Sequence, residues 1–83
     1  MTAAMPDDLE LAARFVAALF KATRGRPGHF RYIDDIAALA GIEEVDVERA
    51  LRAAGDSGFL VTHFYKPMAM LTEEGLEAAR QAY

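Results

Sequence analysis

Between Ala40 and Leu60 the chain reads A-G-I-E-E-V-D-V-E-R-A-L-R-A-A-G-D-S-G-F-L, and between Leu71 and Gly75 it reads L-T-E-E-G. In the first segment a glycine stops one helical pattern, and residues 44–54 then repeat apolar positions at the three-and-four spacing of a second helix. Two further glycines end that helix just before residues with strand composition. The segment therefore predicts two helices joined by a tight turn and followed by a strand. The second segment is typical of a strand that runs into a closing helix.

The residues before this region predict a long first helix over 7–23. Asp7 is positioned to cap its first turn, and Glu10 follows three residues later, as in a capping box. One apolar stripe faces the expected core and consists of Leu9, Ala12, Ala13, Val16, Leu19 and Phe20. A second stripe lies on the neighbouring face and consists of Leu11, Phe15, Ala18 and Ala22. This second stripe has two interpretations: the helix is buried in the centre of one subunit, or Leu11 and Phe15 form the seam of a homodimer.

Turn residues and apolar patterns divide the rest of the chain into short elements. Gly25, Pro27 and Gly28 end the first helix, because glycine tolerates left-handed backbone and proline cannot continue a helix. The later elements are, in chain order, a strand at 29–32, a helix at 33–40, the helix at 44–54, strands at 59–64 and 68–71, and a last helix that starts at Thr72 and carries Leu76, Ala79 and Tyr83 on one side. This order predicts an α+β, mostly helical fold in a single domain spanning residues 1–83.

The composition is that of an ordered, acidic chain of 83 residues. Hydrophobic residues make up 53% of it, which excludes a disordered segment, and the formal net charge of −4 repels nucleic acid and acidic membranes at long range. With no cysteine, the chain has no disulfide, thiolate nucleophile or thiolate zinc site. The N-terminal residues lack the basic start and apolar core of a signal peptide, and no apolar run is long enough to span a membrane. We therefore expect a cytoplasmic protein that does not enter a membrane.

From Ile33 to about Arg80 the chain resembles the winged-helix part of MarR-type transcription regulators. In that family a helix of the form L-A-x-x-L-G precedes the recognition helix, and the hairpin, or wing, ends at L-T-x-x-G. The matching positions here are Ile36, Leu39, Gly41, Ile42, Val47, Leu51, Gly58, Phe59, Leu60, Leu71, Thr72 and Gly75. The resemblance implies a winged helix-turn-helix fold and a transcription regulator that binds double-stranded DNA. Apolar residues and glycines at such positions specify a fold more than a ligand.

The segment at the position of the family's recognition helix is acidic. Members of the family usually carry neutral or basic side chains there, which contact phosphates and base edges. Here Arg49 and Arg52 stand among five acidic residues, which are Glu43, Glu44, Asp46, Glu48 and Asp56. Several carboxylates facing phosphates repel a duplex, although acids at a helix N-terminus also stabilise the helix dipole. The acidic helix is therefore also a candidate surface for a protein partner.

One segment points toward nucleic acid. Residues 21–31 contain Lys21, Arg24, Arg26 and Arg31, four of the nine basic residues, together with His29 and Phe30 and no acid. Arginines interleaved with an aromatic residue contact phosphate and stack on bases, whereas the alternative is a solvated loop at a helix C-terminus. The candidate nucleic-acid contacts are Arg24, Arg26, Arg31, Arg49, Arg52 and Lys66. Convergence of the basic residues on one face favours DNA binding, and scattering favours protein binding.

The expected hairpin carries more apolar residues than one face can bury. Because side chains alternate between the two faces of a strand, the residues His63, Phe64, Tyr65, Pro67, Met68 and Met70 cannot all face inward. Exposed aromatic and methionine side chains are typical of interfaces, so Phe64, Tyr65 and Met68 are candidate partner contacts. The alternative is that the second stripe of the first helix covers them.

Catalytic and metal-binding patterns are absent from the sequence. His29 and His63 stand alone, and the adjacent acids Asp34 and Asp35 project in different directions from a helix, which is the wrong relation for a paired acid and base. We therefore expect a non-enzymatic regulatory protein without a metal or cofactor. Its expected function is DNA-binding transcriptional regulation, and the alternative is a winged helix that binds a protein through its acidic third helix or its aromatic hairpin.

Overall fold

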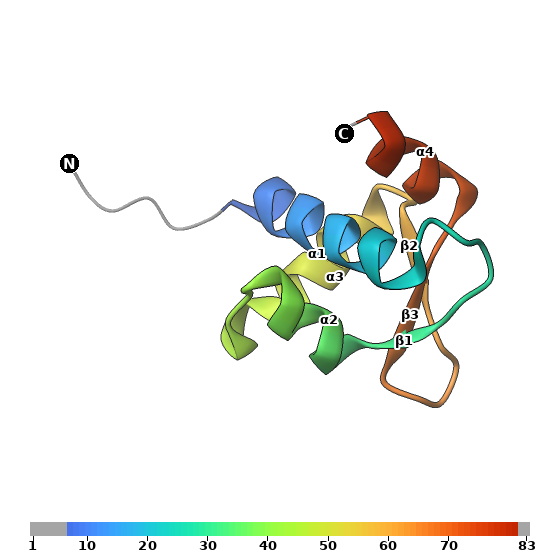
Figure 1. Ribbon diagram of the computed structural model, residues 1–83. Helices are drawn as coiled ribbons and strands as arrows, with labels where there is room; N and C mark the ends of the chain where they lie inside the picture. The colour runs from blue at the N-terminus through green and yellow to red at the C-terminus, as the bar shows by residue number, and fades with distance from the viewer. Residues whose placement is uncertain (1–6, 82–83) are drawn as a thin grey trace.

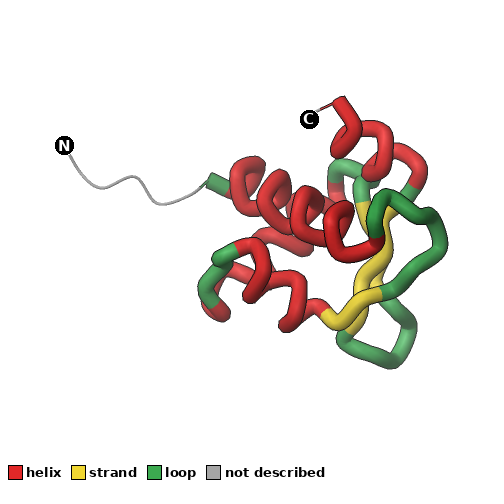
Figure 2. The backbone as a smooth tube through the Cα atoms, in the orientation of Figure 1, coloured by secondary structure: helices red, strands yellow, loops and turns green. Residues whose placement is uncertain are grey.

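A computed structural model describes residues 7–81 of the chain as an α+β arrangement with four helices and three short strands. The elements are α1 (Asp8–Thr23), β1 (Arg31–Tyr32), α2 (Ile33–Ala40), α3 (Glu44–Asp56), β2 (Leu60–Thr62), β3 (Met68–Leu71) and α4 (Glu73–Gln81). Figure 1 shows their arrangement in space, and Figure 2 separates helices, strands and loops. The order of elements predicted from the sequence is confirmed.

The three strands form one antiparallel sheet in the order β1-β3-β2. β2 and β3 are the arms of a hairpin, in which Leu60 pairs with Leu71 and Thr62 pairs with Ala69. β1 adds to the other edge of β3, where Tyr32 pairs with Met68. The pairing of β1 with β3 brings the loop that follows α1 to the side of the hairpin, so two segments far apart in sequence become neighbours.

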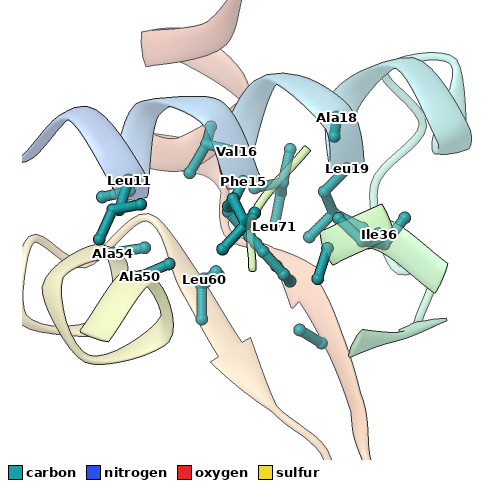
Figure 3. Packing of buried hydrophobic residues seen from close by; sticks show 14 of the residues in the cluster. Leu11, Phe15, Val16, Ala18, Leu19, Ile36, Ala50, Ala54, Leu60 and Leu71 are labelled. Atoms are coloured by element: carbon teal, nitrogen blue, oxygen red, sulfur yellow. The ribbon is translucent and has the colours of Figure 1, made fainter. Parts of the chain in front are cut away.

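The core lies between α1 and the elements beneath it. Figure 3 shows the α1 side chains pointing toward α3, the sheet and α2. The four largest fully buried side chains are Phe15, Leu11, Leu19 and Ile36. Burying an aliphatic or aromatic side chain of this size contributes about 1.5–3 kcal/mol. This central cluster therefore supplies much of the free energy that holds both ends of the molecule to α1.

The burial of α1 corrects the expectation of an intersubunit seam. Leu11 is 1% exposed and Phe15 is 0% exposed, both within the chain's own core. They present no surface to a second copy, because α2, α3 and the sheet already cover the second stripe. The interpretation of a buried central helix is the correct one. Leu9, by contrast, was expected to face the core and is 71% exposed.

The helix boundaries predicted from the sequence are close to those of the structure, and where the two differ the cause is local. The side chain of Asp7 accepts a hydrogen bond of 2.7 Å from the backbone N–H of Glu10, as predicted for the cap. The Glu10 carboxylate instead pairs with Arg14 at 3.2 Å, so the reciprocal half of the capping box is missing. α3 continues through Gly55 to Asp56, and the chain leaves helical geometry at Gly58, whose φ is 77°.

The segment L-T-E-E-G joins the hairpin to α4. The Thr72 hydroxyl accepts a hydrogen bond of 3.0 Å from the Gly75 N–H, as expected of an N-cap, and donates one of 2.6 Å to the Gly58 carbonyl. Gly75 is buried, and a Cβ there would overlap the backbone of Phe59. Glycine is therefore required at this crossing. Tyr83, predicted to lie beside Leu76 and Ala79, falls outside the described residues.

Candidate nucleic-acid interface

The charged residues divide between the two ends of α1. This helix has 16 residues and is therefore about 24 Å long. At its C-terminal end, residues 21–33 and 57–72 meet through the β1–β3 pairing, and we call these two segments the basic end. They hold Lys21, Arg24, Arg26, Arg31 and Lys66, which are five of the nine basic residues, and none of the 13 acidic ones. The basic end therefore carries a local charge opposite to that of the whole chain.

The arginines of the basic end gather around the turn that ends α1. Arg24 caps the helix with a left-handed backbone, φ 56°, and its N–H bonds back to the Lys21 carbonyl at 3.2 Å. Within the described residues, Arg24, Arg26 and Arg31 form no ion pair with an acid. Together with His29, these three arginines line one hollow beside Ala22 and Thr23. Arg31 donates a hydrogen bond of 3.3 Å to the Ala22 carbonyl, which holds its guanidinium at the rim.

A second part of the basic end is the hairpin tip, residues 63–67. The His63 Nδ1 atom accepts hydrogen bonds of 3.1 Å from the backbone N–H groups of both Tyr65 and Lys66. The backbone N–H of His63 donates a hydrogen bond of 2.8 Å to the Met68 carbonyl, and the backbone N–H of Met68 donates one of 2.7 Å to the Lys66 carbonyl. The His63 side chain thus satisfies two backbone donors, and together with the backbone bonds it closes the tip as a tight turn.

The closed tip presents two aromatic rings to solvent. Phe64 is 90% exposed and Tyr65 is 82% exposed, with their ring centroids 5.0 Å apart in an edge-to-face arrangement. Behind them, the His63 ring packs edge-on against Phe30 at 5.0 Å. The Phe30–His63 contact links residues 24–31, which we call the arginine loop, directly to the tip. The alternative that α1 covers these rings is wrong. Met68, the third candidate partner contact, lies in β3 and is only partly exposed.

The remaining basic candidates lie on α3 and are paired with acids. The Arg49 guanidinium contacts Asp8 at 2.9 Å, at the start of α1, and Asp46 at 3.1 Å. The hydrogen bond to Asp8, with the attraction of both carboxylates, raises the pKa of Arg49 above its usual value. Arg52 pairs with Glu48 at 3.0 Å. The structure thus gathers Arg24, Arg26 and Arg31 around one hollow and places Lys66 on the hairpin, whose strand β3 pairs with β1. It keeps Arg49 at the opposite end of α1.

Acidic residues border the basic end on two sides. Pro27 shares a groove with the α4 residues Glu73, Glu74 and Glu77. On the other side, Asp34 and Asp35 occupy the first turn of α2 and are exposed. Carboxylates therefore lie beside the basic end at Pro27 and directly after β1, and we call the surface from the arginine loop to the hairpin tip the positive track.

Sequence reasoning found the arginine loop but missed its union with the hairpin. The signal was present in the chain, because no acid occurs between Asp56 and Glu73. This second acid-free run is hydrogen-bonded to the first through β1, a strand of two residues whose register cannot be read from composition. The prediction that the hairpin exposes some of its aromatic residues is confirmed for Phe64 and Tyr65.

The rest of the described chain offers little competing chemistry. Residues 7–81 contain no group of three or more His, Cys, Asp or Glu side chains arranged to hold a metal ion. None of the helices in this range is long and apolar enough to cross a membrane. Comparison of the chain with protein-family models, with curated proteins and with solved structures gives no match.

Proposed function

We propose that the protein is a non-enzymatic winged-helix regulatory protein that binds DNA through its basic end. The order of elements and the residues that resemble MarR-type regulators support the winged-helix assignment. The observation that carries the proposed function is the gathering of five basic residues and no acid on segments 21–33 and 57–72. A cluster of like charges repels itself, and an anionic ligand relieves that repulsion.

The proposed surface differs from the one that the resemblance implies. At the position of the recognition helix, Glu44 and Glu48 are exposed, and both arginines of α3 are already paired with acids. A duplex approaching α3 meets carboxylates, whereas one approaching the basic end meets arginines without acidic partners in the described structure. The field of the whole protein is negative, so it orients an approaching polyanion toward the basic end.

The experiment is a titration of a fluorescein-labelled random duplex, followed by anisotropy over a series of salt concentrations. The double variant Arg24→Ala/Arg26→Ala should bind more weakly, and the slope of log affinity against log salt should fall by about two if each arginine contacts one phosphate. The matched control is Arg14→Ala/Arg80→Ala, which removes two positive charges outside the basic end, each paired with a glutamate. Equal losses in the two double variants would mean that only net charge matters, and would reject the proposed surface.

A second candidate function rests on the exposed face of α3. Val45 is 80% exposed and lies between the exposed acids Glu44 and Glu48 in the sequence of α3. An apolar side chain among carboxylates suits a basic protein partner better than DNA. Loss of a pulled-down partner in the double variant Glu44→Gln/Glu48→Gln, with no DNA binding by the wild-type chain, would favour this function over the first.

A further inference from the structure

The hairpin tip carries aromatic surface that phosphate binding alone does not explain. Phe64 and Tyr65 expose almost their whole side chains, although the turn that holds them is closed by His63 and buttressed by Phe30. The hydrogen bonds to His63 hold the backbone that carries both rings, so the backbone of the tip loses little conformational entropy when the rings contact a flat apolar surface. Lys66 lies next to them in the same turn.

Nucleobases match this combination of rings and positive charge. Proteins that bind single strands combine a basic track for the backbone with aromatic side chains on which bases stack. The basic end has both parts: the hollow lined by Arg24, Arg26 and Arg31, and the tip with Phe64 and Tyr65. The Phe30–His63 ring contact joins the two parts into one surface.

The acidic residues beside the positive track favour a single strand over a duplex. Acids of α4 and of the first turn of α2 border the track, and α3 adds further exposed carboxylates. A duplex presents two phosphate backbones and extends over these acids, whereas a single strand follows the track and keeps its charge away from them. In a duplex the bases are also stacked on each other and present only their edges to a protein.

We propose that the DNA bound by this protein is single-stranded, with its phosphates on the arginine loop and an unstacked base on the ring of Tyr65 or Phe64. This inference rests on the proposed function and names the state of the nucleic acid and the way in which it is held. It also assigns the hairpin tip a role in stacking on bases rather than in reading a groove.

The experiment uses tryptophan as a local reporter, because the chain contains none. Tyr65→Trp places the sole indole at the tip, where a stacked base quenches its fluorescence. Val45→Trp places it on α3 at a position that is 80% exposed, as a matched control on the helix that would enter a duplex groove. Each variant is titrated with oligothymidylate of about 15 nucleotides and with a duplex of similar length.

The expected result is quenching of Tyr65→Trp by the single strand and none of Val45→Trp. In a parallel anisotropy titration of the full chain, Tyr65→Ala should weaken single-strand binding by about fivefold or more and leave the salt slope unchanged, because stacking releases no counterions. Tyr65→Phe keeps the ring and should restore binding. Tyr65 is exposed, so these substitutions leave the core intact.

The possible failures are distinguishable. Tighter binding of the duplex than of the single strand, with quenching at Val45→Trp and none at Tyr65→Trp, overturns the inference and leaves DNA binding in place. An unchanged affinity in Tyr65→Ala likewise overturns the stacking role. No binding of either nucleic acid at low salt overturns both the inference and the proposed function.

Discussion

The two ends of α1 use their charged residues in different ways. At the N-terminal end, Arg49 is held between Asp8 and Asp46, so its charge is neutralised within the chain and joins α3 to α1. At the C-terminal end, Arg24 and Arg26 are exposed and pair with no acid in the described structure. An ion pair within the chain contributes to the stability of the fold, whereas a cluster of like charges without acidic partners destabilises the fold through repulsion. The contrast indicates which end is available to a ligand.

The same contrast applies to apolar side chains. Phe15, a residue of α1, is completely buried in the core, whereas Phe64 is 90% exposed at the hairpin tip. Phe15 continues an apolar stripe of α1, whereas Phe64 stands in a hairpin that carries more apolar residues than one face can bury. Phe15 lies in the core beside Leu60 and Leu71 of the sheet, as Figure 3 shows, whereas Phe64 lies in the turn between β2 and β3.

The largest expected effect is on the core that both ends share. Phe15→Ala should lower the free energy of unfolding by about 3–5 kcal/mol, because it leaves a cavity in a fully packed site. For a chain of this length that is a large part of a total of roughly 4–12 kcal/mol. Chemical denaturation followed by circular dichroism measures it, with exposed Leu9→Ala as a control that should change little. If Phe15→Ala instead left the chain stably folded and lowered its oligomeric mass, the interpretation of Phe15 as part of a homodimer seam would be correct after all.

The next effect concerns the crossing that attaches the hairpin to α4. Gly75→Ala should destabilise the protein by about 1–3 kcal/mol, because its Cβ would overlap the Phe59 backbone. Gly55→Ala is the matched control, since Gly55 lies within α3 with no atom within 4 Å of an added Cβ. It should stabilise the chain by about 0.4–1 kcal/mol. Thermal unfolding of both variants gives the sign of each change in stability. Stabilisation by Gly75→Ala as well as by Gly55→Ala would show that the Phe59 backbone leaves room for a Cβ at position 75.

These positions also show how much the sequence alone could predict. The caps at Asp7 and Thr72 and the turn glycines are local signals, so the order and approximate bounds of the elements follow from them. Burial is not local. Leu39 continues the apolar pattern of α2, yet it is 69% exposed, whereas Ile36 and Ala37 of the same short helix are buried in the core.

The candidate site was predictable only in parts for the same reason. Each acid-free segment is visible in the sequence, but their union depends on pairing between Tyr32 and Met68, 36 positions apart in the chain. A pairing of such long range has no local signature in a strand of two residues. The ion pair between Arg49 and Asp8 is equally non-local, and it is what removes Arg49 from the group of candidate DNA contacts.

A smaller effect tests the separation of the two ends. Arg49→Ala removes the ion pairs with Asp8 and Asp46, so it should lower the melting temperature slightly while leaving DNA affinity nearly unchanged. Arg24→Ala should do the reverse, weakening DNA binding with little change in melting temperature. Thermal unfolding and an anisotropy titration on the same two proteins measure both properties. A loss of DNA affinity in Arg49→Ala at unchanged stability would place a DNA contact on α3 and end the contrast between the ends.

The smallest expected effect is on DNA binding when the exposed acids of α3 are neutralised. If DNA contacts only the basic end, Glu44→Gln/Glu48→Gln changes affinity by less than about threefold, because solvent and salt screen charges at that separation. If α3 enters a major groove, removal of two carboxylates beside phosphates should tighten duplex binding strongly, and most at low salt. Glu44 lies in the first turn of α3, where its charge stabilises the helix dipole, and Glu48 pairs with Arg52, so the loss of each acid costs at most about 1 kcal/mol of stability. The titration is therefore run well below the measured unfolding transition of the double variant. A tightening that disappears at high salt would assign DNA contact to α3, whereas an unchanged affinity at every salt concentration leaves the basic end as the binding surface.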